Sequence, residues 1–263
     1  WHLKKAPMPH SSENLRLASY NLHKCRGMTG PHAPERNLAV IAELGADVIA
    51  LQEVDFRFGA RPEALPRALI EEATGMVPAP FLGTGENSLG WHGQTILLRP
   101  ELRDKAEIRR LPLPGIEPRG ALVLRLPGLT VVALHLGLIR SSRRAQLSRI
   151  VAQVRRIGHD RVVLTGDFNE WHDSRGLEAL EPLRVIAPGP SWPALFPRLR
   201  YDRFALSRSI DVLDCGVLDN ETARQASDHL PIWADLRLNP PVNPPPGAAD
   251  HTAAQRNVTG NNK

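Results

Sequence analysis

The sequence contains few cysteines and no long hydrophobic run. Its 263 residues include only two cysteines, Cys25 and Cys215, which stand far apart. Two isolated thiols exclude a disulfide framework and a thiolate zinc site. The longest apolar stretch, residues 129–139, is interrupted by His135 and is shorter than the roughly 18 residues that a membrane-spanning helix needs. The first residues also lack the apolar centre of a secretory signal, so we expect a cytoplasmic protein with reduced thiols and no membrane span.

Lysine and aromatic residues are scarce as well. Only five of the 33 basic residues are lysines, and the arginines that make up the rest suit bidentate phosphate contacts, although codon bias explains the same imbalance. The net charge of +5 is a mild bias that is compatible with a phosphate-bearing substrate. With 5% aromatic residues there is no ladder for stacking single-stranded bases, and the arginines form no basic stripe.

The two ends of the chain hold too few apolar residues to form a core. Residues 1–13 are polar, and the segment from residue 239 begins with NPPVNPPPGAAD. We therefore expect a flexible lead-in over 1–13, one folded domain over 14–238 and a disordered proline-rich tail over 239–263.

The central part alternates between short strand-like runs and a few helices. The periodicity predicts strands at 15–21, 47–54, 93–99, 119–126, 129–136, 161–168, 201–207, 210–218 and 230–236. It predicts helices at 34–46, 62–73 and 141–158, the last capped by Ser141 or Ser142. Many strands with few helices indicate an α/β sandwich.

Carboxylates, amides and imidazoles recur where these strands end. They are Asn21, Glu53, His135, Asp167, Asn169, Asp202, Asp228 and His229. The set has no nucleophilic lysine and no serine in a tight glycine turn. Such a set indicates a hard divalent cation and the activation of water.

Five segments in order, SYNLHKC, LQEVD, LTGDFNEW, YDRFAL and SDHLPIW, resemble the motif series of the endonuclease/exonuclease/phosphatase superfamily over nearly all of 14–238. The size of the chain is similar to that of the short, largely uncharacterised bacterial members, and YDRFAL resembles the deoxyribonuclease-like branch. The resemblance implies a four-layer α/β sandwich of two packed mixed β-sheets flanked by helices, with the site at one end.

The resemblance also implies a role for each polar residue. Glu53 would be the principal ligand of Mg²⁺ or Mn²⁺, with Asn21 and Asp228 beside it. Asp167 would orient or deprotonate the attacking water, and Asp202 would hold His229. His135, Asn169, Asn21 and Arg119 would contact phosphate oxygens. Other interpretations stay open, among them a turn role for Asn21, a backbone-bonded His135, a surface Arg119, a solvated helix face for Arg143, and a Glu53 paired with Arg57 or Arg26.

The chain departs from the family pattern next to one of these motifs. Many relatives carry Gly-Asn-Ala where this sequence reads GQT, so Gln94 replaces a site amide. Trp91 and His92 could line the pocket instead. The glutamate that orients the first histidine in deoxyribonuclease-like members has no clear counterpart.

We therefore expect a metal-dependent phosphoesterase, with nucleic acid, DNA or RNA, as its first substrate class. A phospholipid or inositol-phosphate hydrolase is the alternative, and it would need an apolar wall from 81–93 or 191–199. A catalytically silent binding module is the third hypothesis. No protein partner can be inferred.

Overall fold

Two six-stranded mixed sheets make up the centre of the molecule in this computed structural model, which describes residues 14–56, 59–81, 83–158 and 160–239. The first sheet has the order β11 (Ile210–Val217), β12 (Ile232–Leu238), β1 (Asn14–Asn21), β2 (Val48–Gln52), β4 (Gln94–Leu98) and β3 (Val77–Pro78). The second has the order β5 (Glu107–Leu113), β6 (Arg119–Leu126), β7 (Leu129–His135), β8 (Val162–Asp167), β10 (Asp202–Leu206) and β9 (Arg184–Ile186). The predicted lead-in, and the predicted tail from residue 240, lie outside the described residues.

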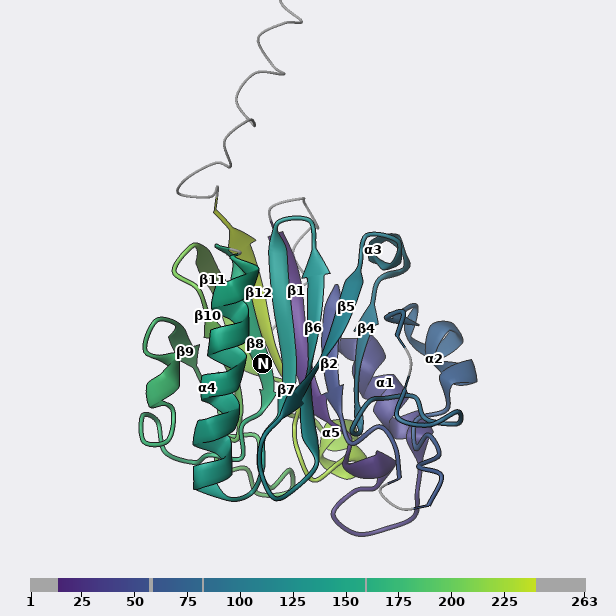
Figure 1. The fold of residues 1–263 in the computed structure, drawn as a ribbon. Helices are drawn as coiled ribbons and strands as arrows, with labels where there is room; N and C mark the ends of the chain where they lie inside the picture. Colours follow the sequence, from purple (N-terminus) through teal and green to yellow (C-terminus); the bar gives the residue numbers. More distant parts are fainter. Residues whose placement is uncertain (1–13, 57–58, 82, 159, 240–263) are drawn as a thin grey trace, which may run out of the picture.

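Helices cover the outer faces of both sheets (Figure 1). They are α1 (Pro34–Leu44), α2 (Arg67–Thr74), α3 (Pro100–Arg103), α4 (Arg140–Ile157) and α5 (Glu221–Ala226), with two short 3-10 turns, η1 (His23–Cys25) and η2 (Glu178–Leu180). The parallel pairs β1–β2 and β7–β8 are each connected by a long helix, α1 and α4 respectively. The structure thus confirms the predicted α/β sandwich of two mixed sheets flanked by helices.

Three apolar clusters correspond to the three interfaces between these four layers. One joins α1 to the outer face of the first sheet, a second lies between the sheets, and a third joins α4 to the second sheet. Successive residues of a strand point to opposite faces, so every second residue enters the space between the sheets. Leu17 of β1, Val163 of β8 and Phe204 of β10 all belong to that middle cluster.

The same alternation places polar side chains at the ends of these strands. Counting by twos from Leu17, Val163 and Phe204 leads to Asn21, Asp167 and Asp202. These residues therefore share the inner face with the core, at the point where each strand begins or ends.

The predicted cap of α4 is wrong. Neither Ser141 nor Ser142 caps α4, because the helix begins at Arg140, with Ile139 as a cap residue that makes no side-chain hydrogen bond. Instead, the guanidinium of Arg143 donates to the carbonyls of Gly137 and Leu138 at 3.2 and 2.6 Å and fixes the entry to the helix.

The remaining sequence expectations concern the thiols and the membrane. Both cysteines are free, Cys25 buried and Cys215 partly buried. Within the described ranges no helix has the length and apolar character needed to cross a membrane.

Candidate active site

Six side chains on the inner faces meet at one end of the sandwich. They are Asn21, Gln52 and Gln94 in the first sheet and His135, Asp167 and Asp202 in the second. The three members of each set are cross-strand neighbours in register. A hydrogen bond of 3.2 Å from Nδ2 of Asn21 to Oδ2 of Asp167 joins the two sets.

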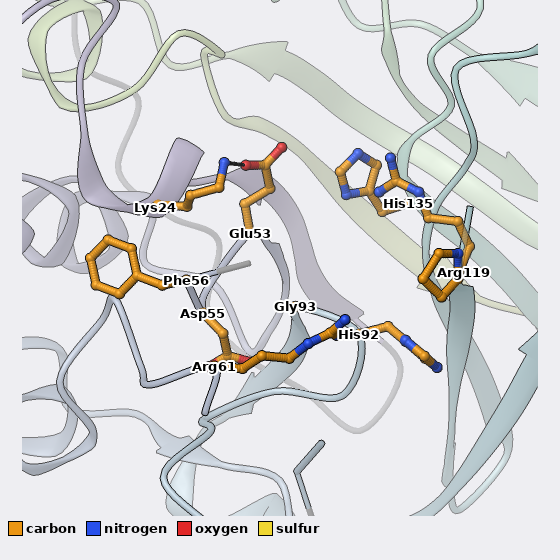
Figure 2. Close-up of a pocket in the computed structure, with 10 residues that line it drawn as sticks. Lys24, Glu53, Asp55, Phe56, Arg61, His92, Gly93, Arg119 and His135 are labelled. Atoms are coloured by element: carbon orange, nitrogen blue, oxygen red, sulfur yellow. Dashed lines mark hydrogen bonds and ion pairs between the residues drawn. The ribbon is translucent and has the colours of Figure 1, made fainter. Parts of the chain in front are cut away.

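Glu53 follows β2 directly and faces Lys24 across the site (Figure 2). The ammonium of Lys24 forms an ion pair with Oε2 of Glu53, and the backbone N–H of Lys24 donates to the carbonyl of Glu53 at 3.1 Å. Burial raises the pKa of Glu53, but the neighbouring His135 and Lys24 outweigh it and lower the pKa to about 2. Glu53 is therefore an ionised carboxylate whose partner among the described residues is the Lys24 ammonium and not Arg26; Arg57 lies outside the described residues.

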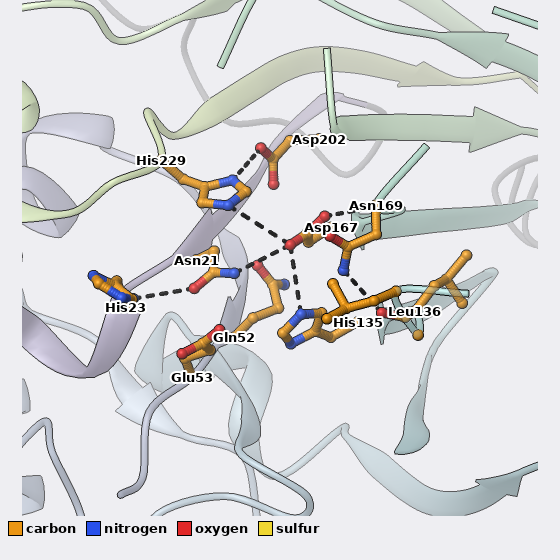
Figure 3. A network of polar contacts seen from close by, with 12 residues as sticks. Asn21, His23, Gln52, Glu53, His135, Leu136, Asp167, Asn169, Asp202 and His229 are labelled. Atoms are coloured by element: carbon orange, nitrogen blue, oxygen red, sulfur yellow. Dashed lines mark hydrogen bonds and ion pairs between the residues drawn. The ribbon is translucent and has the colours of Figure 1, made fainter. Parts of the chain in front are cut away.

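Asp167 is at the centre of a second, buried group (Figure 3). Its Oδ2 lies 3.5 Å from Nε2 of His135 and 3.7 Å from Nε2 of His229, and its Oδ1 accepts the backbone N–H of Asn169 at 2.8 Å. Burial and the carboxylate of Asp202 raise the pKa of Asp167, whereas His229 lowers it, and the net direction is upward. Because its pKa is raised, the carboxylate of Asp167 is a better proton acceptor than an ordinary aspartate, as a general base requires.

The glycine of the TGDFN motif is needed for this placement. Gly166 has a φ of +147°, and a Cβ there would lie 1.9 Å from the carbonyl oxygen of Leu134 on β7. Only glycine allows β7 and β8 to approach this closely, and the approach aligns His135 with Asp167.

His229 and Asp202 form a pair in the buried part of the site. Nδ1 of His229 lies 2.8 Å from Oδ2 of Asp202, which also accepts a 2.6 Å hydrogen bond from the hydroxyl of Ser191. Burial lowers the pKa of His229, but the carboxylates of Asp202 and Asp167 more than offset this and raise it. His229 is therefore a cation whose Nε2 points at Asp167.

His135, unlike His229, is uncharged. Burial, followed by the nearby Arg119, lowers its pKa to about 3, so the imidazole is neutral at neutral pH. The two imidazoles beside Asp167 thus differ in charge, one being a donor only and the other a donor and an acceptor.

Two further predicted site residues, Asn169 after β8 and Asp228 before His229, contact neighbouring segments. Asn169 has a φ of +50°, a region that asparagine tolerates, and its Nδ2 donates to the carbonyl of Leu136 at 2.9 Å. Asp228 accepts from Nε1 of Trp192 at 3.3 Å and lies 3.8 Å from Nδ1 of His23.

The donor set fits a hard divalent cation held mainly by one carboxylate. Among the residues that the structure describes, no group of three histidine, cysteine or acidic side chains could hold an ion without further ligands. Glu53 is ionised, and Mg²⁺ commonly keeps several waters when one or two carboxylates bind it. The amide oxygen of Asn21 accepts the backbone N–H of His23 at 3.0 Å, as the turn interpretation expects.

Arg119 faces the site, whereas Gln94 does not. Arg119 lines the same pocket as Glu53 and His135, and its guanidinium pairs with Glu117 at 2.8 Å. Gln94 donates its Nε2 to the carbonyl of Gly120 at 2.5 Å, so its amide reaches across to the second sheet. Trp91 packs over Gly120, where an added Cβ would lie 2.2 Å from the Trp91 ring. Of Trp91 and His92, only His92 lines the pocket.

A buried ionic network behind the site was not predicted from the sequence. Glu170 is 1% exposed and binds Arg140 at 2.8 Å and Arg143 at 2.7 Å. Arg203, also 1% exposed, donates to the carbonyls of Glu170 and His172. The alternative of a solvated helix face for Arg143 is wrong because the side chain is buried. No sequence signal distinguishes such arginines from surface ones.

The two segments considered as apolar walls differ. Phe196, in 191–199, is 72% exposed, whereas Phe81, at the start of 81–93, packs against the core between the sheets. Among the described residues of these two segments, which leave out Leu82, the large apolar side chains exposed to solvent belong to 191–199.

Comparisons with known proteins agree with this geometry. The sequence model of the Endonuclease/Exonuclease/phosphatase family matches residues 18–229. A search of curated proteins gave no match.

Three similar solved structures have the same fold. An endonuclease/exonuclease/phosphatase from Beutenbergia cavernae is 21% identical with a TM-score of 0.64, over 86% of this chain and 72% of that one. D. rerio TDP2 complexed with a single-strand DNA product is 16% identical with a TM-score of 0.64, over 85% of this chain and 99% of that one. A mannosyl-6-phosphatase from Bacteroides thetaiotaomicron is 19% identical with a TM-score of 0.62, over 84% and 99%.

Proposed function

The chain belongs to the endonuclease/exonuclease/phosphatase family, and we propose that it is a Mg²⁺- or Mn²⁺-dependent phosphodiesterase that hydrolyses nucleic acid. The observation that carries the proposal is the buried Asp167 between a neutral and a charged imidazole, with the ionised Glu53 nearby. A proton acceptor, a cationic donor and an ionised carboxylate at one site are the groups that attack of water on phosphorus needs.

Asp167 and His229 divide the proton chemistry. Asp167 orients the attacking water and takes its proton, a role that a carboxyl group with a raised pKa can perform near neutral pH. His229, kept protonated by Asp202, donates from Nε2 to an oxygen on which negative charge develops. Asp202 acts through His229 by fixing its tautomer and orientation.

The remaining residues bind the phosphate. His135, Asn21 and Asn169 present nitrogen donors around Asp167, and Arg119 approaches from the Glu53 side. Glu53 would hold the divalent cation, and Asn21 and Asp228 are its further predicted ligands. When bound, such a cation neutralises charge on the phosphate and polarises its oxygens.

The choice of nucleic acid rests on two supports. The basic side chains Lys24, Arg61 and Arg119 surround Glu53, and a structure of the same fold carries a DNA product. The comparisons give the lipid alternative no support. A mannosyl-6-phosphatase has the same fold, so the fold alone does not determine which phosphoester is hydrolysed.

Nicking of supercoiled plasmid by the purified protein tests the proposal. We expect relaxed circles with Mg²⁺ or Mn²⁺, none with EDTA, and none with Asp167→Ala. Asp211→Asn, which changes an exposed aspartate paired with Arg237, is the matched control and should retain activity.

Two results would overturn the proposal in different ways. Equal silence of the folded wild type and Asp167→Ala would exclude this nucleic-acid activity and make phospholipids and inositol phosphates the next substrates to assay. Nicking that survives Asp167→Ala would show a contaminating nuclease or a different catalytic group.

A further inference from the structure

A pocket beside Glu53 collects basic side chains, of which the proposed chemistry uses only Arg119. Its lining includes Lys24, Arg61, His92 and Arg119, together with Glu53 (Figure 2). They come from η1, from the loop after β2, from the turn before β4 and from the start of β6. Four separate segments thus converge on one opening next to the site.

The backbone is strained where the pocket side chains are attached. Lys24, Glu53, Arg61 and His92 have φ angles of 58°, 55°, 49° and 50°. Each such angle costs a residue with a Cβ about 1–3 kcal/mol, and this kind of strain concentrates at sites that bind or react. Most of the non-glycine residues with positive φ in the described chain line this pocket or directly flank Lys24.

Several polar side chains in the pocket have few or no hydrogen-bond or ion-pair partners among the described residues. Within residues 14–56, 59–81, 83–158 and 160–239, no side-chain hydrogen bond or ion pair engages the guanidinium of Arg61. Nδ1 of His92 is buried without a hydrogen-bond partner. Among the described residues the side-chain ammonium of Lys24 pairs with Glu53 alone, so another cation bound to that carboxylate would release it.

The pocket also contains acidic groups, which limit the charge it can accept. Asp55 lines it, but its carboxylate accepts the N–H groups of Leu89 at 2.8 Å and Gly90 at 3.1 Å. Glu117 pairs with Arg119 at the rim. The lining therefore holds three cationic side chains, Lys24, Arg61 and Arg119, and two carboxylates, Glu53 and Asp55. The net charge of the pocket becomes more positive when a metal cation binds Glu53.

We propose that this pocket is a second phosphate subsite, so that the preferred substrate carries another phosphate group on the nucleotide next to the scissile bond. The inference rests on the proposed function and deepens it, because it distinguishes a phosphorylated strand end or flanking phosphate from an isolated phosphodiester. Arg61 and Lys24 are the residues that determine this preference. Both present donors suited to a phosphate oxygen.

The first test measures turnover of paired small substrates. Thymidine 5′-(4-nitrophenyl phosphate) is compared with its 3′-phosphorylated form, and thymidine 3′-(4-nitrophenyl phosphate) with its 5′-phosphorylated form. We expect kcat/KM to be about tenfold or more higher for the form with the second phosphate in one of the pairs, as charge-assisted hydrogen bonds imply. Arg61→Gln should reduce that ratio to near one, whereas the control Arg156→Gln, on the exposed end of α4, should preserve it.

The second test does not depend on turnover. The ring signals of ¹⁵N-labelled histidine are recorded by NMR while inorganic phosphate is added in the presence of Mg²⁺. We expect the His92 signals to shift in the wild type and in Arg156→Gln, and to stay in place in Arg61→Gln.

The two tests separate the possible failures. If no substrate turns over but the His92 shift depends on Arg61, the subsite stands and the proposed function fails. If the substrates turn over with equal efficiency in both pairs, or Arg61→Gln leaves the preference and the His92 shift unchanged, the second subsite is excluded.

Discussion

At the scale of single residues, the carboxylate of Asp202 controls the charge of His229. The imidazole is 5% exposed, and burial alone would make it neutral. Asp202 reverses that tendency from 2.8 Å, and Ser191 holds the same carboxylate oxygen in place. His229 can then donate a proton to developing charge, whereas burial and the nearby Arg119 keep His135 neutral.

Asp202→Asn tests this dependence. The amide has nearly the same size but no negative charge, so the pKa of His229 should fall and the fraction of protonated imidazole with it. We expect kcat to drop about a hundredfold, within the usual range for losing a positioned acid or base, with KM changing less. Steady-state kinetics and NMR of the His229 ring measure the two effects. An unchanged kcat in a folded variant would remove Asp202 from the mechanism.

Lys24 is a residue whose role the sequence could not indicate. The motifs identify Glu53, but the partner of Glu53 depends on the left-handed backbone of residues 23–25, for which histidine, lysine and cysteine are unusual choices. The same holds for Ser191 and Arg203, whose importance depends on contacts between distant segments. The motifs thus predicted that His229 and Asp202 pair, but the partners of Lys24, Ser191 and Arg203 could not be predicted because they lie on segments far away in the sequence.

Lys24→Met should therefore bind Mn²⁺ more tightly than the wild type does. The substitution removes the ammonium that occupies Glu53, and a partly exposed ion pair of this kind is worth about 1 kcal/mol, or about fivefold in affinity. Electron paramagnetic resonance of free Mn²⁺ gives the dissociation constant without any turnover. Lys105→Met, on an exposed turn, is the control. Weaker binding by Lys24→Met would mean that Glu53 is not the ion's ligand.

At the scale of secondary-structure elements, the loops that follow β7 and β8 are joined by buried ion pairs. Arg143 on α4 binds the carbonyls after β7 and the carboxylate of Glu170 after β8. Arg203 on β10 binds the carbonyl of Glu170 from the other side. His135, Asp167 and Asn169 sit at the start of these loops, so the network fixes the elements that present them.

The ionisation of Glu170 makes this network sensitive to acid. Burial raises the pKa of Glu170, but hydrogen bonds from Arg140 and Arg143 outweigh it and lower the pKa to about 2, below the ordinary 4.5. Because the pKa of Glu170 is lower in the folded state than in the unfolded chain, its ionisation stabilises the fold at pH values above the unfolded-state pKa. That stability is lost as the pH falls towards the folded-state pKa. The full contribution is about 3 kcal/mol, of which about 2 kcal/mol is lost between about pH 5 and about pH 3.

Urea unfolding across this pH range measures the loss. The wild type should lose about 2 kcal/mol more than Glu170→Gln, since the amide cannot titrate. Near neutral pH the variant should itself be less stable by about 3 kcal/mol, because it leaves the buried Arg143 and the partly exposed Arg140 without a carboxylate partner. Glu107→Gln, from an exposed pair with Arg125, should follow the wild type. Parallel pH profiles for the wild type and Glu170→Gln would contradict the assigned ion pairs.

At the scale of the whole molecule, the central strands could be predicted from the sequence and most of the edges could not. The inner strands are buried on both faces and appear as apolar runs. The missed strands β3, β5 and β9 all lie at a sheet edge. Edge strands carry charges and prolines that discourage pairing with other chains, and Arg109, Arg110 and Pro112 of β5 hide its strand pattern. Pro66 ends the extended chain just before α2, so the helix predicted from 62 begins at Arg67.

The boundaries of the folded domain give the last prediction. All three apolar clusters lie between Leu15 and Leu238, and Asn14, the first residue of β1, is paired with Arg237 of β12. A fragment of residues 14–239 retains every one of these contacts. We therefore expect its Tm to lie within about 2 °C of that of the full chain, which corresponds to less than about 1 kcal/mol.

A slightly shorter fragment, residues 18–239, is the control that should fail to fold. It lacks Arg16, which binds both carboxylate oxygens of Asp235 at 2.7 and 2.8 Å and lies 4.5 Å over the ring of Trp233. It also lacks Leu17, which is completely buried between the sheets, and half of β1, the strand that joins β12 to β2. Removing a central strand's pairing and a buried leucine costs several kcal/mol, so calorimetry should find no cooperative unfolding transition. If 18–239 unfolded like the full chain, β1 would not be the strand on which the first sheet depends.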